Sequence, residues 1–213
     1  VLNAGAKASI DHAYIAYGGG QTPIEGTFDR FNVVETHQGD LRLANSRVEN
    51  NAAGTSATSR SGRGANVAAT IFVRGGQPAI LGNDFRNNEG ALVSINANAM
   101  SDVERPDPGR STGLIDRNAS HDDNRGPLVA ENRLISTVAG AIAGLQVRGE
   151  EITVESVWDD VDIVHVLQNE IIVQNFHTAT GVRLVSRSDA SLVVKLAGTN
   201  AGFTAAGYGL SLI

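Results

Sequence analysis

The stretch Asn83-Asp84-Phe85-Arg86-Asn87-Asn88-Glu89-Gly90 decides the fold, because its pattern recurs along the chain. The pattern is Asn, any residue, an apolar or small residue, any residue, two polar residues and then Gly. Further copies occupy residues 45–54, 118–126 and 132–140, and residues 11–18 are a divergent first copy. Short apolar runs that end in Asn or Gly flank each copy, and both residue types accept the left-handed backbone of sharp turns. The pattern therefore predicts short strands joined by tight corners.

Repeated strands and corners indicate a chain that coils, with each turn stacked on the previous one. Helical spacing of apolar residues is missing over most of the chain, so we expect an all-β fold. Neighbouring turns would lie about 4.8 Å apart, with columns of inward Val, Ile, Leu and Ala and with Asn stacked on Asn at the corners. At roughly 20 to 25 residues per coil, the chain would make about nine turns. The structural repeat corners are expected at Asn45, Asn83, Asn118, Asn132, Gly54, Gly90, Gly126 and Gly140.

The chain divides into two parts by the character of its repeats. Residues 1–150 are expected to form coils with loop excursions near 52–66 and 101–113, where small, polar, Pro and Gly residues gather. Residues 151–213 carry longer and more β-branched runs, which we interpret as wider coils, with a small antiparallel sheet as the alternative. The last residues have the pattern of a strand stopped midway. We therefore expect a truncated C-terminal end and a segment of a longer polypeptide.

In its repeats the chain resembles the right-handed parallel β-helix proteins, a pectate-lyase-like superfold. The residues that carry the resemblance are 83–90, 45–54 and 140–149, and it extends over about residues 8–150. It implies that the solenoid is a right-handed parallel β-helix. Polysaccharide lyases and hydrolases of this family use a calcium site with a basic residue, or grouped Asp carboxylates. Neither pattern can be matched here residue by residue.

The tail is similar to a module of very large bacterial surface proteins. The similar runs are residues 157–166, 191–196 and 201–205. This similarity implies an extracellular or cell-surface location and a protein of many repeats. It implies no activity.

Composition excludes several functional classes. Of 213 residues, 17 are basic and 23 are acidic, and a net charge of −6 without a basic block argues against nucleic-acid binding. Cysteine is absent, which excludes disulfides and thiolate metal sites. No run approaches the roughly 20 apolar residues that a membrane helix needs, so no membrane span is expected.

The densest acidic cluster is a candidate metal site. Asp160 and Asp162 would share one face of a strand. Together with Asp159 and loop carbonyls they offer oxygen ligands of the kind that Ca²⁺ takes. The alternative is a turn after Trp158 in which the Asp side chains cap backbone amides. Calcium is the only cofactor that the sequence suggests, and no catalytic residue is predicted.

Other polar groups favour structural roles. The run His121-Asp122-Asp123-Asn124 could bind a metal or act in acid–base chemistry, but it falls at a repeat corner and favours a turn. His165 alternates with two valines and is expected to face outward. Several arginines of the loop-bearing half could line a groove for acidic glycans, although their dispersion favours a solubilising role. These arginines are Arg60, Arg63, Arg74, Arg86, Arg105 and Arg110.

These observations predict a non-enzymatic structural segment, a rigid β-solenoid for spacing, adhesion or assembly at the cell exterior. Terminal coils leave strand edges unpaired. The expected partners are therefore flanking domains of the same larger chain or further copies bound end to end, with glycans as a further candidate. The main alternative is a carbohydrate-active lyase or hydrolase, or a glycan-binding β-helix, which requires a groove with clustered carboxylates or exposed aromatics. Calcium-mediated adhesion through residues 159–162 is the third.

Overall fold

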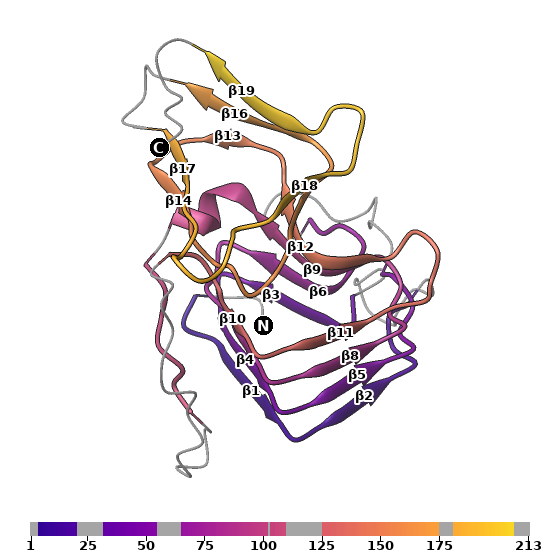
Figure 1. Cartoon of the computed structure of the whole chain (residues 1–213). Helices are drawn as coiled ribbons and strands as arrows, with labels where there is room; N and C mark the ends of the chain where they lie inside the picture. The colour runs from indigo at the N-terminus through magenta and orange to yellow at the C-terminus, as the bar shows by residue number, and fades with distance from the viewer. Residues whose placement is uncertain are drawn as a thin grey trace.

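The computed structural model describes residues 4–20, 32–54, 65–101, 103–109, 125–174 and 181–206. This part of the chain forms an all-β fold of parallel sheets, which confirms the expected class (Figure 1). The helical element found within it is η2 (Ala97–Ser101), a short 3-10 helix. No helix of the described residues is long and apolar enough to cross a membrane.

The chain up to residue 148 contributes its strands to three sheets in rotation. Sheet A consists of β1 (Lys7–Asp11), β4 (Asp40–Ala44), β7 (Ala79–Leu81) and β10 (Leu128–Ala130). Sheet B consists of β2 (Tyr14–Ala16), β5 (Arg47–Glu49), β8 (Asp84–Arg86) and β11 (Arg133–Ile135). Sheet C begins with β3 (Val34–His37), β6 (Ala69–Arg74), β9 (Ala91–Asn96) and β12 (Ile142–Arg148). Each strand pairs in parallel with the strand that follows it in its own sheet, so β2, β5, β8 and β11 lie in a row in Figure 1.

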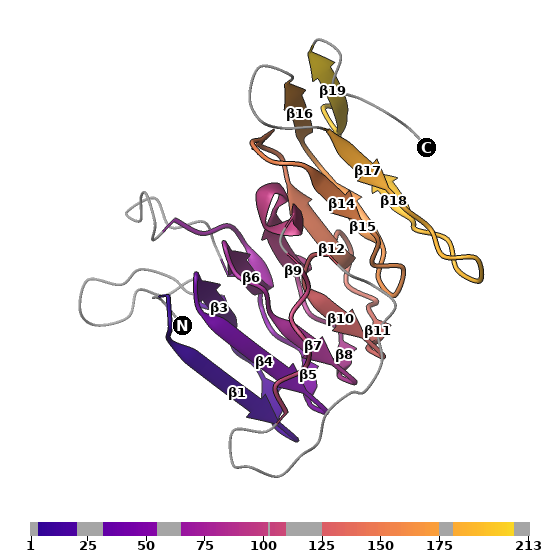
Figure 2. The same ribbon diagram turned by 90° about the vertical axis from the view of Figure 1, so that its left-hand side faces the viewer.

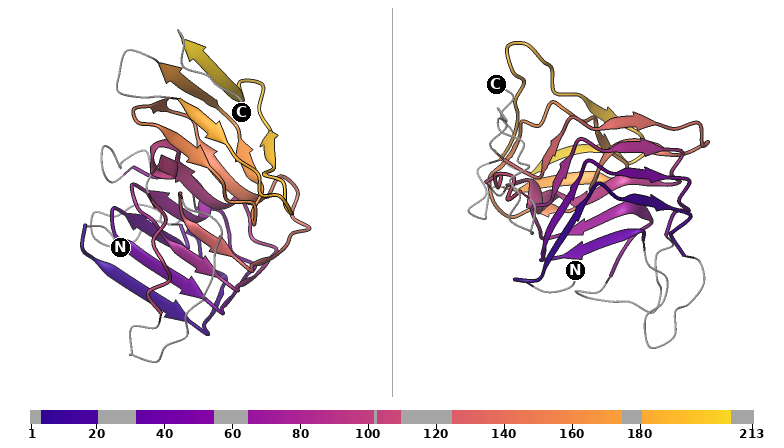
Figure 3. Two further views of the ribbon diagram at one scale, coloured as in Figure 1. Left: turned by 60° about the vertical axis from the view of Figure 1, so that its left-hand side comes forward. Right: turned by 90° about the horizontal axis from the view of Figure 1, so that it is seen from below.

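The later strands keep sheet C and replace the other two sheets. Sheet C continues with β15 (His165–Leu167) and β18 (Val194–Leu196). A three-stranded sheet contains β13 (Glu151–Ile152), β16 (Glu170–Gln174) and β19 (Gly202–Ala206), and a two-stranded sheet contains β14 (Ser156–Trp158) and β17 (Val182–Leu184). These pairs are parallel too, so the antiparallel alternative for the tail is wrong for the described strands. Figures 2 and 3 show β1 and β19 at opposite ends of the stack.

Left-handed residues form the corners between the strands. Four of them lie between sheets A and B, with φ of 49°, 50°, 61° and 58°: His12, Asn45, Gly82 and Glu131. Three more follow the strands of sheet B, with φ of 59°, 53° and 48°: Tyr17, Asn50 and Asn87. Residues other than Gly and Asn rarely adopt this backbone. Strand pairing on both sides of the corner therefore holds residues such as Glu131 in a conformation that their side chains disfavour.

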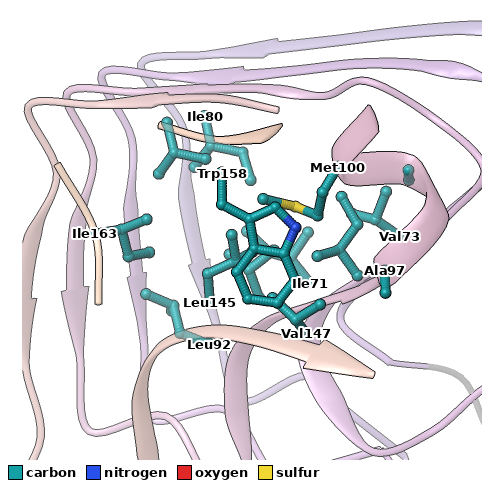
Figure 4. Packing of buried hydrophobic residues seen from close by; sticks show 14 of the residues in the cluster. Ile71, Val73, Ile80, Leu92, Ala97, Met100, Leu145, Val147, Trp158 and Ile163 are labelled. Carbon is teal, nitrogen blue, oxygen red and sulfur yellow. The ribbon is translucent and has the colours of Figure 1, made fainter. Parts of the chain in front are cut away.

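The core lies between the sheets and is built from columns of inward side chains. In sheet C, Val34, Ile71, Val93 and Leu145 are register partners in successive strands. They belong to one apolar cluster that also takes in the inward residues of sheets A and B. Trp158 occupies the middle of this cluster near Met100 of η2 (Figure 4), and its indole N–H donates to the hydroxyl of Ser156 at 2.9 Å. This single tryptophan therefore reports on the packing between sheets A to C and the sheets that the later strands form.

The expected coil length of roughly 20 to 25 residues holds for some turns and not for others. In sheet C the register partners Ile71 and Val93 are 22 positions apart, and Leu145 and His165 are 20 apart. The turns that contain sheets A and B are longer. Equivalent corner residues are 33 positions apart between the first and second turns, 37 between the second and third, and 49 between the third and fourth. Insertions between strands cause these differences, because the paired strands themselves are only two to seven residues long. About nine turns are not found either, because sheet C, the longest sheet of the described residues, contains six strands.

Candidate functional site

An amide ladder runs along the corner between sheets A and B. The side-chain amide of Asn83 donates to the carbonyl of Leu43 at 2.8 Å and to Oδ1 of Asn132 at 3.0 Å. Its Oδ1 accepts the backbone N–H of Ser46 at 2.9 Å. Asn132 repeats this pattern one turn later, and the Ser46 hydroxyl accepts the N–H of Ala13 one turn earlier at 3.0 Å. Each side chain thus satisfies backbone groups of the preceding turn that burial would otherwise leave unpaired.

A second ladder follows the corner after sheet B. Oδ1 of Asn51 accepts the N–H of Gly18 at 2.8 Å, and its side-chain amide donates to Oδ1 of Asn88 at 2.8 Å. The amide of Asn88 in turn donates to the carbonyl of Val48 at 2.9 Å. Both asparagines are buried. Two independent rows of side-chain amides therefore tie successive turns together.

The predicted Asn corners occupy two different positions. Asn45 is the left-handed residue itself, with φ of 50°. Asn83 and Asn132 stand one position later and form the ladder. Asn118 lies outside the described residues.

The predicted Gly corners also differ among themselves. Gly90, Gly126 and Gly140 have φ of 71°, 87° and 79°, which favours glycine. Gly54 has another role, because a Cβ atom there would lie 2.1 Å from Oδ1 of Asn32. Close packing against Asn32 requires glycine at this position.

A buried polar cluster lies on the outer face of sheet C. Oε1 of Glu35 accepts the N–H and the side-chain amide of Asn32, both at 3.0 Å, and the amide of Asn66 at 2.7 Å. Its Oε2 lies 3.1 Å from Nε2 of His37, whose ring packs on Phe72 with centroids 5.1 Å apart. The side chains of Glu35 and His37 are only 4% and 3% exposed. This arrangement holds the sheet together and is poorly accessible for acid–base chemistry on a ligand.

A cavity of about 600 Å³ lies next to this cluster. Phe72 lines it, and the Arg148 guanidinium carbon is 4.4 Å from the Phe72 ring centroid, a cation–π contact. Arg148 also donates to the hydroxyl of Ser94 at 3.0 Å. Burial lowers the pKa of Arg148 to about 10, with Glu150 opposing this shift and Arg74 adding to it. Two guanidinium groups and one carboxylate line the cavity, which favours an anionic ligand.

A second cavity, of about 390 Å³, lies between the outer face of sheet A and residues 103–109, which we call the strap. Arg42 of β4 anchors the strap: its Nε donates to Oδ1 of Asp107 at 2.7 Å and its Nη2 to Oδ2 at 3.3 Å. Arg42 also pairs with Asp11, and the Arg42 and Asp107 side chains are 3% and 0% exposed. Burial lowers the pKa of Arg42, but its hydrogen bonds to Asp107 and Asp11 outweigh burial and raise it overall.

The predicted calcium ligands lie in the turn after β14. Oδ1 of Asp160 accepts the N–H of Asp162 at 3.0 Å, the contact expected of a capping turn. Asp159 and Asp160 are buried, whereas Asp162 is exposed. Within the described ranges, no group of three or more His, Asp or Glu side chains is placed to hold a metal ion. Calcium binding by Asp159, Asp160 and Asp162 stays a prediction.

The expected outward orientation of His165 is wrong. Its register partners in sheet C are Leu145 and Val194, so it continues an inward column, and it is 0% exposed. The ring stacks on Trp158 with centroids 5.6 Å apart, and burial lowers its pKa to about 4 against a small opposing effect of the Ile163 backbone. All three residues of β15 are buried, so hydrophobic alternation could not show which face is inward.

Several predicted groups fall outside the described residues. They are residues 121–124, Arg60, Arg63 and Arg110. Of the remaining arginines, Arg74 lines the cavity over sheet C and Arg105 lines the cavity under the strap, whereas Arg86 pairs with Asp84 on sheet B.

No protein-family model, curated protein or solved structure matches the chain. Its function must therefore be inferred from its own geometry.

Sequence reasoning missed Glu35, Arg42 and Arg148. Each is a charged residue within a strand whose neighbours are largely buried, as in Leu41-Arg42-Leu43. A buried charge must be paired, so such isolated charges signal a partner. The partner of Arg42 is 65 positions away, however, and no local pattern indicates it.

Proposed function

We propose that the chain is a right-handed parallel β-helix segment whose function is structural: a stiff solenoid that spaces or displays other parts of a surface protein. The rotation of the strands through sheets A, B and C supports this proposal. The two amide ladders are the strongest support for the proposal, because they join successive turns through side chains in addition to the hydrogen bonds between strands.

Stiffness follows from how the turns are joined. Every turn satisfies backbone groups of its neighbour, so bending the stack would break hydrogen bonds in several sheets at once. Sheet C adds continuity, because its six strands link the early turns to the late ones. Nothing in such a design requires a catalytic group.

The strand edges at the ends of the stack support a role within a larger assembly. β1, β2 and β3 are edge strands of their sheets, and β18 and β19 are edge strands at the other end. Apolar residues near the last strands remain exposed, among them Val193 at 49% and Leu196 at 57%. In this proposal flanking domains of the same chain, or copies joined end to end, cover these edges at the cell exterior.

Distance measurements by double electron–electron resonance test the stiffness. The chain contains no cysteine. Spin labels can therefore be placed specifically at Ser9→Cys on β1 and Lys195→Cys on β18, both exposed positions. A rigid solenoid gives one narrow distance distribution that does not change between dilute buffer and crowded solution. A broad or two-peaked distribution would contradict the proposed function.

The cavity over sheet C favours a second candidate function, the binding of an acidic glycan. Arg74 and Arg148 both line it, and the Glu150 carboxylate already accepts the N–H of Asn98 at 2.6 Å. A carboxylate that already accepts a backbone hydrogen bond is poorly placed to act as the acid or base of a hydrolase. The arrangement therefore favours glycan binding over glycan hydrolysis. We expect Arg74→Met to weaken binding of a sulfated glycan such as heparin, whereas Arg183→Met, an exposed change on β17, leaves it unchanged. Equal binding by the two variants would exclude this site.

A further inference from the structure

The cavity under the strap lies between a sheet and a loop of the chain. Its floor is the outer face of β1 and β4, and its roof includes Pro106 and Pro108 of the strap. The buried Arg42–Asp107 pair holds the strap against the sheet. A pocket whose walls are already held by paired charges loses little free energy to ordering when a ligand enters.

The side chains that face this cavity are mainly positive. Lys7, Arg42 and Arg105 line it together with a single carboxylate, Asp40. Arg42 pairs with two carboxylates, Asp107 of the strap and Asp11 of β1. At the mouth, Lys7 and Asp40 are register partners on neighbouring strands, but Asp40 forms its ion pair with Arg105. Three cations are thus balanced by three carboxylates, but the Lys7 ammonium is the cation among them that has no carboxylate partner in the described part of the chain.

Two polar groups of β1 face this region without a partner among the described residues. They are the ammonium group of Lys7 and the hydroxyl of Ser9, which lies two residues along the same strand and therefore on the same face. An ammonium group and a hydroxyl offer hydrogen bonds that a carboxylate or phosphate oxygen accepts. Ala79 and the two prolines supply apolar surface for the rest of such a molecule.

We propose that the cavity under the strap binds a small organic anion, through Lys7 and Ser9 with Arg105 at the mouth. The anionic group is a carboxylate or a phosphate, and the apolar part of the ligand packs against the strap. This site is separate from the cavity over sheet C. It does not depend on the structural function proposed above.

Calorimetric titration of the full chain with succinate, and separately with inorganic phosphate, tests this site at low ionic strength. We expect saturable binding with a dissociation constant of about 1 mM or tighter for one probe, and the better probe identifies the anionic group. Lys7→Met should weaken that binding at least about tenfold, and Ser9→Ala should weaken it less. Both residues are exposed. These changes therefore should not impair folding, which far-ultraviolet circular dichroism checks.

Lys195→Met is the matched control, because Lys195 is an exposed lysine on β18 at the other end of the stack. It removes the same charge and should leave the affinity unchanged. Absence of heat with both probes at about 10 mM would overturn the proposal. Equal weakening by Lys7→Met and Lys195→Met would overturn it too, because it would reveal only attraction to the overall charge of the protein.

Discussion

Replacing Asn83 by alanine removes one complete step of the ladder between sheets A and B. Three hydrogen bonds are lost: those with the Leu43 carbonyl, the Ser46 N–H and Oδ1 of Asn132. Asn83 is 1% exposed, so water cannot easily replace the lost contacts. A buried polar group without a partner costs about 1 to 3 kcal/mol. Oδ1 of Asn132 keeps its bond to the backbone N–H of residue 83, so we expect a loss of about 3 to 5 kcal/mol.

Urea unfolding followed by the fluorescence of Trp158 measures this loss. The chain has one tryptophan, and it is fully buried in the core. Asn200→Ala serves as the control, because Asn200 is exposed and its side chain makes no hydrogen bond to a described residue. We expect the control to change the free energy of unfolding by less than about 0.5 kcal/mol.

Asn83→Ser separates the ladder from simple loss of volume. Serine already serves at the equivalent position one turn earlier, where the hydroxyl of Ser46 accepts the N–H of Ala13. A serine at position 83 should accept the Ser46 N–H and recover part of the stability that Asn83→Ala loses. If Asn83→Ala costs less than about 1 kcal/mol, or Asn83→Ser unfolds as easily as Asn83→Ala, the ladder does not stabilise the stack.

Two further changes have defined outcomes. The pKa of His165 is about 4 in the folded protein and 6.5 for the free side chain. Below pH 6.5 the unfolded state therefore binds more protons than the folded state. The free energy of unfolding falls by about 3 kcal/mol in total as the pH falls from 6.5 towards 4. His165→Leu should abolish this acid sensitivity in urea titrations at pH 7 and pH 4.5, and an unchanged pH dependence would assign it to other groups. Arg42→Met leaves the buried carboxylate of Asp107 and the half-buried carboxylate of Asp11 without this cation. It should cost about 3 to 5 kcal/mol. Urea unfolding measures this loss. Arg105→Met, at a side chain 61% exposed, should cost at most about 1 kcal/mol in the same assay. Similar losses in the two variants would show that the strap needs no buried pair.

The fold class was predictable because corners and strands are local features. The Asn and Gly residues around Asn83 favour sharp turns of the backbone. The apolar runs between such turns have three to five residues and are too short for helices. The coil length was not predictable, because insertions such as the one that contains the strap change the spacing without changing the pairing. A repeat period holds only where the loops between strands have equal length.

The sites were less predictable because their residues are distant in sequence. Arg42 and Asp107 are 65 positions apart, and Arg148 reaches Phe72 across sheet C. His165 shows a different limit: on a strand buried on both faces, alternation cannot tell inward from outward. Asp160 lies where a local pattern was informative, because a run of Asp after a strand is typical of a capping turn.

Disulfide trapping across two turns measures the parallel register itself. Arg47 and Asp84 are register partners on the outer face of sheet B, and the chain has no cysteine of its own. Strands in adjacent turns lie about 4.8 Å apart, within reach of a disulfide, whereas strands two turns apart do not. The pair Arg47→Cys and Asp84→Cys should therefore oxidise readily to an intramolecular disulfide, and the pair Tyr14→Cys and Asp84→Cys should not. Failure of the first pair to form a disulfide, or equal oxidation of both, would contradict the stacking of successive turns.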